Sequence, residues 1–353
     1  MSEEKVRVGL VGFGGIGNAH LGVWTAQPNA QVLAVCDIVP ERAEAGAQRA
    51  KENYSKNEGD VPEVEIYTDM AEMLKKAPID AVDICTWSGL HGEQGLMAVK
   101  AGKHALIEKP IDLDLAKVDR LIEATDRTKL KVSCIFQSRF GQEIRRANQL
   151  IKEGKLGKII SCSAYCKWWR AQSYYDSADW RGTWALDGGC LANQGIHYID
   201  QLCWMGGPVA EVEYACIQTA MHKMEAEDFA IAVVRFENGA RGIVEATTSA
   251  YPGFDTSTEI FGTRGSAAFD GSRVVSFKVE GEEIDLTTKE EKAGSGKTDP
   301  LAIGLGGHAA QVAEFVSCIL YDQQPAVNVR EARIAIDALC KIYTKAGAPK
   351  AGT

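Results

Sequence analysis

The sequence lacks any apolar run approaching the roughly 18 residues that a membrane-spanning helix needs. Its first residues, MSEEKVRVGLVGFGG, do not combine a basic start with an apolar stretch, because they reach glycine at once. We therefore expect neither a membrane partner nor a secretory leader, and the sequence predicts a cytoplasmic protein.

A basic surface stripe is also missing. Asp and Glu number 48 against 39 Lys and Arg, which gives a formal net charge of −9. Binding to nucleic-acid phosphates relies on clustered Lys and Arg. The composition argues against a nucleic-acid partner and favours a small-molecule substrate.

Closely spaced cysteines are scarce, although the chain contains 10 of them. Cys162 and Cys166 are the one near pair, and neither zinc-type CxxC spacing nor a small disulfide scaffold is present. We expect reduced, mostly buried thiols and no metal site.

The length of the chain sets its domain number, since 353 residues exceed what one hydrophobic core usually organises. A hydrophobic content of 45% is enough for two cores, and no internal repeat interrupts the sequence. Two globular domains are predicted.

The segment KVRVGLVGFGGIGNAHLGVW contains a GxGxxG pattern in the context that a dinucleotide site requires, a strand, a turn and then a helix. Gly12 would make the tight turn, Gly14 would admit a pyrophosphate, and Gly17 would let the helix pack closely. With Ile16, these residues are predicted to bind phosphates at the helix N-terminus. A glycine-rich turn without a ligand is the alternative.

A second apolar strand, AQVLAVCD, ends at Asp37, about 20 residues beyond the last glycine. A carboxylate there can accept hydrogen bonds from the adenosine ribose and repel a 2′-phosphate, which favours NAD over NADP. Arg42 could weaken this discrimination, and a surface Asp at a strand end is the alternative.

Strand and helix patterns alternate up to about residue 127, which predicts a parallel doubly wound sheet. Two further strands end in TWSGLH (86–91) and IEKP (107–110). Ligands of such sheets bind beyond the carboxyl ends of the strands. Glu108 and Lys109 are therefore predicted to point towards the cofactor.

These features together resemble the glucose–fructose oxidoreductase, inositol dehydrogenase and rhizopine-catabolism (Gfo/Idh/MocA) family over essentially the whole chain. The resemblance implies that Lys109 of the EKP motif acts at the reacting carbon, and that Thr86 and His91 belong to the cofactor site. The Pro-Asn usual in the Thr turn of the family is replaced here by Trp87-Ser88.

Beyond residue 127 the pattern changes, so we expect an NAD-binding domain at 1–127 and an α+β substrate and oligomerisation domain at 128–353. IAVVRFENGARGIVEATT predicts two strands joined by a Glu-Asn-Gly turn. A large, mainly antiparallel open sheet is expected, as the resemblance also implies. Its uncovered face predicts a homodimer or homotetramer, and the polar residues 287–300 predict a surface loop.

The stretch GGCLANQGIHYIDQL (188–202) places Asn193 and His197 one helical turn apart on one face, after a glycine pair that would let a ligand approach. In the family, an Asp and a His with this spacing assist and accept the hydroxyl proton. The resemblance makes His197 the base, while Asn193 replaces the Asp and is assigned to substrate binding. A core histidine is the alternative for His197.

Aromatic side chains crowd the preceding segment, CKWWRAQSYYDSADWRGTW. Sugars bind with ring faces on aromatic planes and with hydroxyl or carboxylate groups on Arg, so Trp180, Arg170 and Arg181 are predicted to line a sugar pocket. The Arg pair indicates an anionic group such as a uronate, a phosphate or a nucleotide-linked sugar. A salt bridge to Asp176 or Asp179 would explain one Arg instead, and His308 could reach the pocket or cap its helix.

The sequence therefore predicts an NAD-dependent oxidoreductase that transfers hydride between nicotinamide and a secondary alcohol of a sugar, sugar acid, nucleotide-sugar or cyclitol, with carbohydrate metabolism as its setting. His197 would act as base, with Lys109 assisting. A non-catalytic NAD-binding sugar sensor and a reductase of an imine or a tetrapyrrole-type substrate are the alternatives.

Overall fold

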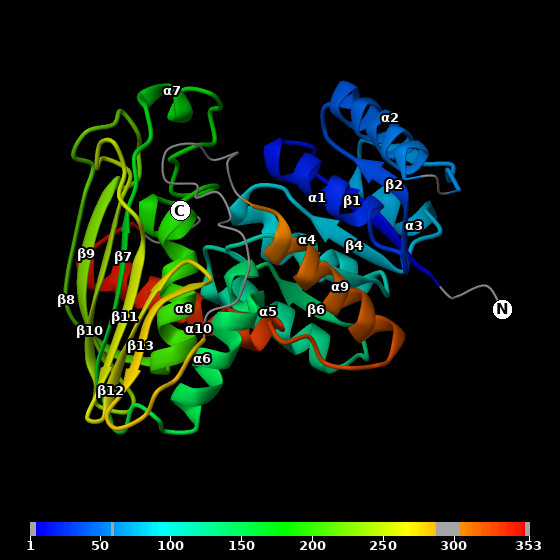
Figure 1. The fold of residues 1–353 in the computed structure, drawn as a ribbon. Helices are drawn as coiled ribbons and strands as arrows, with labels where there is room; N and C mark the ends of the chain where they lie inside the picture. Colours follow the sequence, from blue (N-terminus) through cyan, green and yellow to red (C-terminus); the bar gives the residue numbers. More distant parts are fainter. Residues whose placement is uncertain (1–4, 58–59, 287–303, 350–353) are drawn as a thin grey trace. The chain divides into compact units, whose positions relative to one another are not determined.

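The computed structural model describes residues 5–57, 60–286 and 304–349, so the predicted loop at 287–300 lies outside the described residues. The chain divides into two compact units (Figure 1). The first consists of Met1–Asp112, Ala116–Ile135 and His308–Ala332, and the second of Leu113–Leu115, Phe136–Gly307 and Arg333–Thr353. The boundary at residue 127 stays a prediction, and His308–Ala332 groups with the first unit.

A six-stranded parallel sheet forms the centre of the described part of the first unit, in the order β3-β2-β1-β4-β5-β6. The strand order proceeds outward from β1 in both directions, and the point between β1 and β4 is where such sheets bind ligands. The doubly wound sheet predicted from the sequence is confirmed. The strands are β1 (Val6–Val11), β2 (Ala30–Cys36), β3 (Glu65–Tyr67), β4 (Ala81–Ile84), β5 (His104–Ile107) and β6 (Val132–Cys134).

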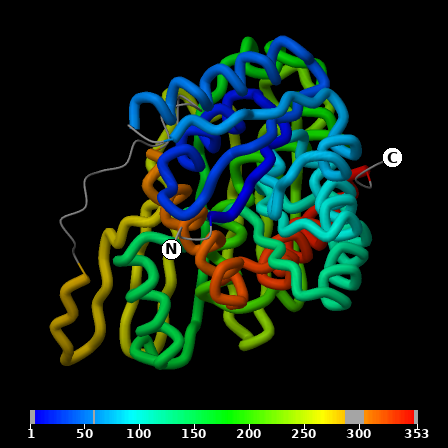
Figure 2. Tube along the Cα trace, turned by 90° about the vertical axis from the view of Figure 1, so that its right-hand side faces the viewer, coloured from blue at the N-terminus to red at the C-terminus, as the bar shows by residue number. Residues whose placement is uncertain are grey.

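Helices connect these strands. They are α1 (Gly15–Thr25), α2 (Pro40–Lys56), α3 (Met70–Lys76), α4 (His91–Lys100) and α5 (Leu115–Asp126). A later helix, α9 (Gly306–Leu320), joins the same core, because Val312, Phe315 and Val316 pack into one cluster with side chains of β1, α1 and β2. Figure 2 shows its orange trace beside the blue trace of the N-terminal part of the chain.

The second unit is built on a seven-stranded sheet in the order β13-β12-β11-β7-β10-β9-β8. Neighbouring strands are antiparallel except β7 and β10, which confirms the predicted, mainly antiparallel sheet. The strands are β7 (Ile159–Lys167), β8 (Val209–Gln218), β9 (Phe229–Phe236), β10 (Arg241–Thr247), β11 (Ser257–Gly262), β12 (Gly265–Asp270) and β13 (Arg273–Val279).

The hairpin of β9 and β10 shows why this sheet has two different faces. Ala230, Ala232, Val234 and Phe236 are buried, whereas the alternate residues of β9 are partly exposed. The turn between the strands contains Gly239 at φ +86°, a conformation that favours glycine. The predicted strand pair and its turn are confirmed.

Helices α6 (Gln142–Lys152) and α8 (Ile196–Gly206) pack against strands of this sheet. Lys341 of the C-terminal helix α10 (Val329–Ala346) donates to the Val209 carbonyl oxygen of β8 at 2.7 Å. Within the second unit, Arg139 donates to both carboxylate oxygens of Asp200, at 2.8 and 2.6 Å, and this buried pair ties α8 to the segment before α6. In the described ranges no helix is both long and apolar enough to cross a membrane.

Candidate functional site

The glycine turn after β1 has a distinct structural reason at each position. Gly12 adopts φ +90°, and a Cβ there would lie 2.7 Å from the Cys85 carbonyl oxygen. A Cβ on Gly17 would come within 1.8 Å of the Gly12 carbonyl oxygen. Gly14 is exposed and a Cβ there would meet nothing within 4 Å, so its missing side chain leaves open space at the start of α1.

This open space is suited to an anionic ligand. The N-terminus of a helix favours negative charge, because of the helix dipole and the amides of the first turn. The chain itself supplies none here, since no side chain caps α1 and its first turn contains no acidic residue. Ile16 is half-buried in the same turn. The turn therefore fits the pyrophosphate that the sequence predicts.

Asp37 connects the glycine turn to the start of α2. Its Oδ2 accepts a hydrogen bond from the Phe13 amide at 2.7 Å, and its Oδ1 accepts one from the Val39 amide at 2.9 Å. A carboxylate can accept about four hydrogen bonds. Asp37 thus keeps acceptor capacity for a ribose hydroxyl while holding the turn in place.

His91 joins the two other loops at the carboxyl edge of the sheet. Its Nδ1 lies 2.7 Å from the Pro110 carbonyl oxygen and its Nε2 lies 3.2 Å from that of Thr86. Burial lowers the pKa of His91, so the ring stays neutral near pH 7. The Thr86 hydroxyl is itself fixed by Gln94, and Trp87-Ser88 lead into a short helical turn, Ser88–Leu90.

Glu108 turns into the first unit, where it is only 4% exposed. Its Oε2 accepts a hydrogen bond from the Lys109 amide at 2.9 Å, and its Oε1 lies 3.0 Å from Nε2 of His20. Burial alone would raise its pKa, but the His20 ring outweighs burial and holds the pKa well below its usual range. The Glu108 carboxylate thus contacts His20 and the Lys109 amide. The next residue, Lys109, is half-buried.

His308 also belongs to the first unit and is 2% exposed, with its ring 5.4 Å from that of His20. Among the described residues, two groups have ligand-type atoms within 4.8 Å of one another, namely His20, Asp83 and Cys85, and His20, Glu108 and His308. Since His20 is already ion-paired with both Asp83 and Glu108, these contacts need no metal.

In the second unit, Asn193 and His197 lie on consecutive turns of a helical segment that begins as a short π-helix, Leu191–Gly195, and continues as α8. Both side chains are half-buried. The His197 ring meets Phe136 edge to face, with centroids 6.2 Å apart. The predicted helix is confirmed, and π-turns recur at functional sites.

The glycine pair before this helix has a reason different from the one that the sequence indicated. A Cβ on Gly189 would lie 1.8 Å from Oε2 of Glu227, and a Cβ on Gly188 would lie 2.5 Å from that of Ala192. The pair thus admits a buried carboxylate and a tight helix start. Glu227 Oε1 accepts hydrogen bonds from the Leu191 amide and the Tyr343 hydroxyl, both at 3.0 Å.

Asn193 is held by a carboxylate that sequence reasoning missed. Its Nδ2 donates to Oδ1 of Asp187, whose Oδ2 accepts the Gly182 amide at 2.7 Å. Tyr174 also interacts with the Asn193 side chain, and burial raises the pKa of this tyrosine. Only the place of Asp187 directly before the glycine pair could have indicated its role.

Arg181 completes this cluster. Its guanidinium lies 4.2 Å from the Tyr174 ring centroid and 4.5 Å from that of Trp180, and its Nε donates to Ser177 at 3.1 Å. Within the described part of the chain, no ion pair joins Arg181 to Asp176 or Asp179, and Asp176 instead accepts a hydrogen bond from Gln172 at 2.9 Å. The salt-bridge alternative is therefore excluded for Arg181. We call Arg181, Tyr174, Asn193 and Asp187 the Arg181 cluster.

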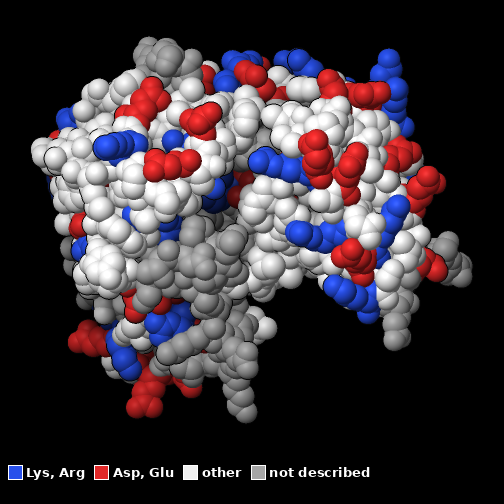
Figure 3. Space-filling model, turned by 90° about the horizontal axis from the view of Figure 1, so that it is seen from above, with Lys and Arg blue, Asp and Glu red and all other residues white. Residues whose placement is uncertain are grey.

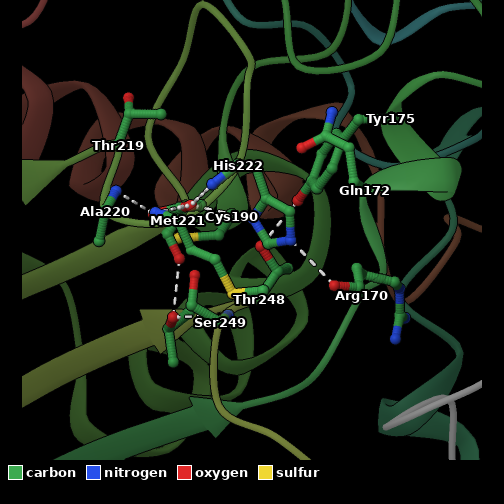
Figure 4. A network of polar contacts seen from close by, with 12 residues as sticks. Arg170, Gln172, Tyr175, Cys190, Thr219, Ala220, Met221, His222, Thr248 and Ser249 are labelled. Atoms are coloured by element: carbon green, nitrogen blue, oxygen red, sulfur yellow. Dashed lines mark hydrogen bonds and ion pairs between the residues drawn. The ribbon is translucent and has the colours of Figure 1, made fainter.

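The loop that contains Arg170 is anchored through its backbone. His222 Nε2 lies 2.9 Å from the Arg170 carbonyl oxygen, and its Nδ1 lies 2.9 Å from Oδ2 of Asp228 (Figure 4). Tyr175 reaches Thr248 at 2.7 Å in the same network. Figure 4 shows the Arg170 side chain extending away from these contacts, and its guanidinium lies 5.6 Å from the Tyr174 ring centroid.

Comparisons with known proteins agree with both units. The model of the oxidoreductase family with NAD-binding Rossmann fold, GFO/IDH/MocA, matches residues 6–136, and that of the GFO/IDH/MocA C-terminal domain matches residues 144–268.

Similar proteins include dehydrogenases of sugars and cyclitols. Myo-inositol 2-dehydrogenase of Thermotoga maritima is 26% identical over 79% of this chain and 80% of its own length. Levoglucosan dehydrogenase of Pseudarthrobacter phenanthrenivorans is 27% identical over 76% of this chain and 75% of its own length. The crystal structure of the WlbA dehydrogenase from Bordetella pertussis, in complex with NADH and UDP-GlcNAcA, is 29% identical with a TM-score of 0.83, covering 98% of this chain and 97% of that one.

The open space at Gly14 gives a direct test of the dinucleotide site. Gly14→Ala should fold normally, because its φ of −72° suits alanine and the added methyl meets no atom, yet NAD should bind at least about tenfold more weakly. Gly22→Ala, also exposed and without neighbours in α1, is the matched control and should bind NAD like the parent. If calorimetry gives the same NAD affinity for Gly14→Ala and the parent, the pyrophosphate does not bind at this turn.

Proposed function

Because the chain belongs to the GFO/IDH/MocA family of NAD-binding oxidoreductases, we propose that it oxidises a secondary alcohol of a sugar acid, free or nucleotide-linked. The observation that carries this proposal is the Arg181 cluster, which contacts the helical segment of His197 through Asn193. It combines a cation that forms no ion pair with a carboxylate in the described chain with hydrogen-bonding groups, one of which, Asn193, lies four residues before the candidate base on the same helical segment.

His197 is proposed to accept the hydroxyl proton. A neutral imidazole titrates near neutral pH and can take a proton from a hydroxyl group as the carbon–hydrogen bond breaks. NAD, when bound, supplies the hydride acceptor. Lys109 is proposed to stabilise the developing alkoxide with its ammonium charge.

Asn193 is proposed to orient the hydroxyl group. Because Asp187 accepts one N–H of its amide and Tyr174 also interacts with it, the amide group of Asn193 has a defined direction. An amide cannot take up a proton, so its contribution is binding rather than proton transfer. The replacement of a family Asp by Asn is offset here by the neighbouring carboxylate of Asp187.

The anionic substrate group is proposed to contact Arg181, and Arg170, whose guanidinium also lies near the Tyr174 ring, is proposed to contribute. A guanidinium forms paired, charge-assisted hydrogen bonds with a carboxylate or phosphate. The similar WlbA dehydrogenase was solved with UDP-GlcNAcA, a nucleotide-linked sugar acid, which supports this substrate class. Trp180, stacked on Arg181, would offer a surface for the sugar.

A sugar sensor without catalysis is the second candidate, and the Asn at position 193 favours it. The presence of Lys109 and His197 argues against it, since a sensor needs no proton acceptor. Asp37 supports NAD as the nucleotide in both cases, because its buried carboxylate would repel a 2′-phosphate.

We also propose that the open face of the second sheet joins two or more copies of the chain. Tyr214, Val233 and Ile243 lie opposite one another on β8, β9 and β10, on the face that helices do not bury. These side chains form an apolar strip bordered by the ion pairs Arg235–Glu211 and Arg241–Glu213. A partly exposed apolar strip with a polar border is suited to a symmetric interface. In the view of Figure 3, acidic and basic side chains lie scattered among uncharged ones.

Light scattering tests this assembly. The parent should have the mass of a dimer or tetramer at micromolar concentration, and Val233→Arg together with Ile243→Arg should shift it towards monomer, because charge on a buried face opposes association. Ile38→Arg, at a position 71% exposed in the first unit, is the control and should leave the mass unchanged. A monomeric parent would contradict the proposal.

The proton acceptor is tested by His197→Ala. Turnover should fall by about 10² to 10⁴, since a general base is removed, while the dissociation constant of NAD changes little. Lys109→Met should behave similarly, whereas Asn193→Ala should raise KM more than it lowers kcat. Steady-state kinetics and NAD calorimetry separate these effects. Full activity of His197→Ala would contradict the assignment of His197 as the base.

The anion contact is tested by Arg181→Met with a charged and a neutral substrate. KM for the sugar acid should rise at least about tenfold, as loss of a charge-assisted hydrogen bond costs about 1.5–3 kcal/mol, while KM for a neutral sugar stays within about threefold. Arg145→Met is the matched control, since Arg145 also stacks on an aromatic ring, 4.4 Å from the centroid of Phe140. Equal rises in KM for both substrates would contradict the anion contact.

A further inference from the structure

A buried cluster of ionisable side chains in the first unit has no part in the hydroxyl chemistry proposed above. It consists of His20 on α1, Asp83 on β4, Glu108 at the end of β5 and His308 on α9, and we call it the His20 cluster. Their exposed fractions are 0%, 0%, 4% and 2%. Buried charges are costly unless they are paired, so this arrangement requires a reason.

His20 bridges the two carboxylates. Its Nδ1 lies 2.8 Å from Oδ2 of Asp83, which also accepts the Trp24 indole N–H at 2.6 Å, and its Nε2 lies 3.0 Å from Oε1 of Glu108. Carboxylate oxygens lie within 3.0 Å of both ring nitrogens, and of these two contacts the one with Asp83 has hydrogen-bond geometry. The two negative charges favour the protonated ring, an imidazolium. Burial alone would lower the pKa of His20, but Cys85 and Asp83 raise it well above its usual range.

His308 contributes no second positive charge to the cluster. Burial and the adjacent His20 lower its pKa to about 4, so it is neutral near pH 7. One imidazolium therefore stands between two carboxylates, and the remaining negative charge is met in part by backbone and indole N–H groups. Removing His20 alone would leave two buried carboxylates without their shared cation.

The hydrogen bonds around Glu108 connect the His20 bridge to the backbone of Lys109. The Glu108 amide donates to the Ile84 carbonyl oxygen at 2.9 Å, where the ladder between β4 and β5 ends. At the next residue, the Lys109 amide donates to Oε2 of Glu108 itself. The direction of the chain at Lys109 is thus coupled to the position of the Glu108 carboxylate, which His20 contacts through the other oxygen.

We propose that His20 is a positioning residue for Lys109, because it fixes the Glu108 carboxylate that in turn holds the Lys109 backbone. This inference rests on the role proposed for Lys109. A reacting group displaced by about 1 Å can lose about 10² in rate, so a loosened Lys109 lowers turnover without preventing nucleotide binding.

The test compares His20→Phe, which keeps a ring but no charge, with the double variant His20→Phe/Asp83→Asn. The second substitution removes one of the two buried carboxylate charges that His20→Phe leaves without their cation, so that loss of folding is limited. His104→Phe is the matched control, because His104 lies at the opposite end of β5 and bonds the Lys131 amide at 2.8 Å. For each variant we would measure kcat per folded molecule, the NAD dissociation constant, and hydrogen exchange of the peptide that contains Lys109.

The proposal predicts a fall in kcat of at least about tenfold in the double variant, with KM and the NAD dissociation constant within about threefold and exchange at Lys109 at least about tenfold faster. His104→Phe should match the parent in all of these. A purely structural role would lower the folded fraction and leave kcat per folded molecule and local exchange unchanged, which would overturn the proposal.

Lys109→Met separates this inference from the proposed function. If Lys109→Met is inactive while the double variant keeps full kcat, the positioning role is wrong and the function stands. If Lys109→Met keeps full activity, the role of Lys109 is wrong, and hydrogen exchange alone decides whether His20 orders this segment. If the purified parent contains one equivalent of zinc and His20→Phe contains none, the His20 cluster is a metal site and not a set of ion pairs.

Discussion

The close approach of α1 to the turn after β1 is the contact on which the nucleotide half of the protein depends. Only hydrogen at the α-carbon of Gly17 leaves room for the Gly12 carbonyl oxygen, and the turn this creates is tied by Asp37 to the start of α2. The same packing brings His20, one turn further along α1, against Asp83 and Glu108. The same close packing of α1 thereby positions both its N-terminus, where the phosphates are proposed to bind, and His20, which is proposed to hold Lys109 through Glu108.

The second unit depends on a comparable approach, in which Glu227 lies directly beneath Gly189. Its carboxylate holds the first amide of the π-helix and the hydroxyl of Tyr343 on α10, and burial raises its pKa to about 7. The helical segment that contains Asn193 and His197 therefore starts from a fixed point. Asp187, from the preceding turn, orients Asn193 and links it to the tyrosine stacked on Arg181.

Local patterns predicted much of this structure, because the glycine turn, the Asp37 strand end and the β9–β10 hairpin each depend on neighbours within the same segment. Long-range contacts were not predictable in this way. Glu227 is 38 positions from Gly189, and α9 returns to the first core from the far end of the chain, so no periodicity indicates either contact. The glycine pair was consequently attributed to a ligand rather than to Glu227. His20 and Asp83 were not predicted, because a single ionisable residue within an apolar helix or strand has no distinctive sequence pattern.

The central claim is that this chain transfers hydride from a sugar acid to NAD, rather than merely binding both. It is tested most directly by following reduced nicotinamide by absorbance when the purified protein is mixed with NAD and a panel of free and nucleotide-linked sugar acids, neutral sugars and cyclitols. The account predicts turnover with a sugar acid, slowed several-fold when the carbinol hydrogen is deuterium. Tight binding of NAD and a sugar acid without any reduction of the nicotinamide would contradict it and identify the protein as a sensor.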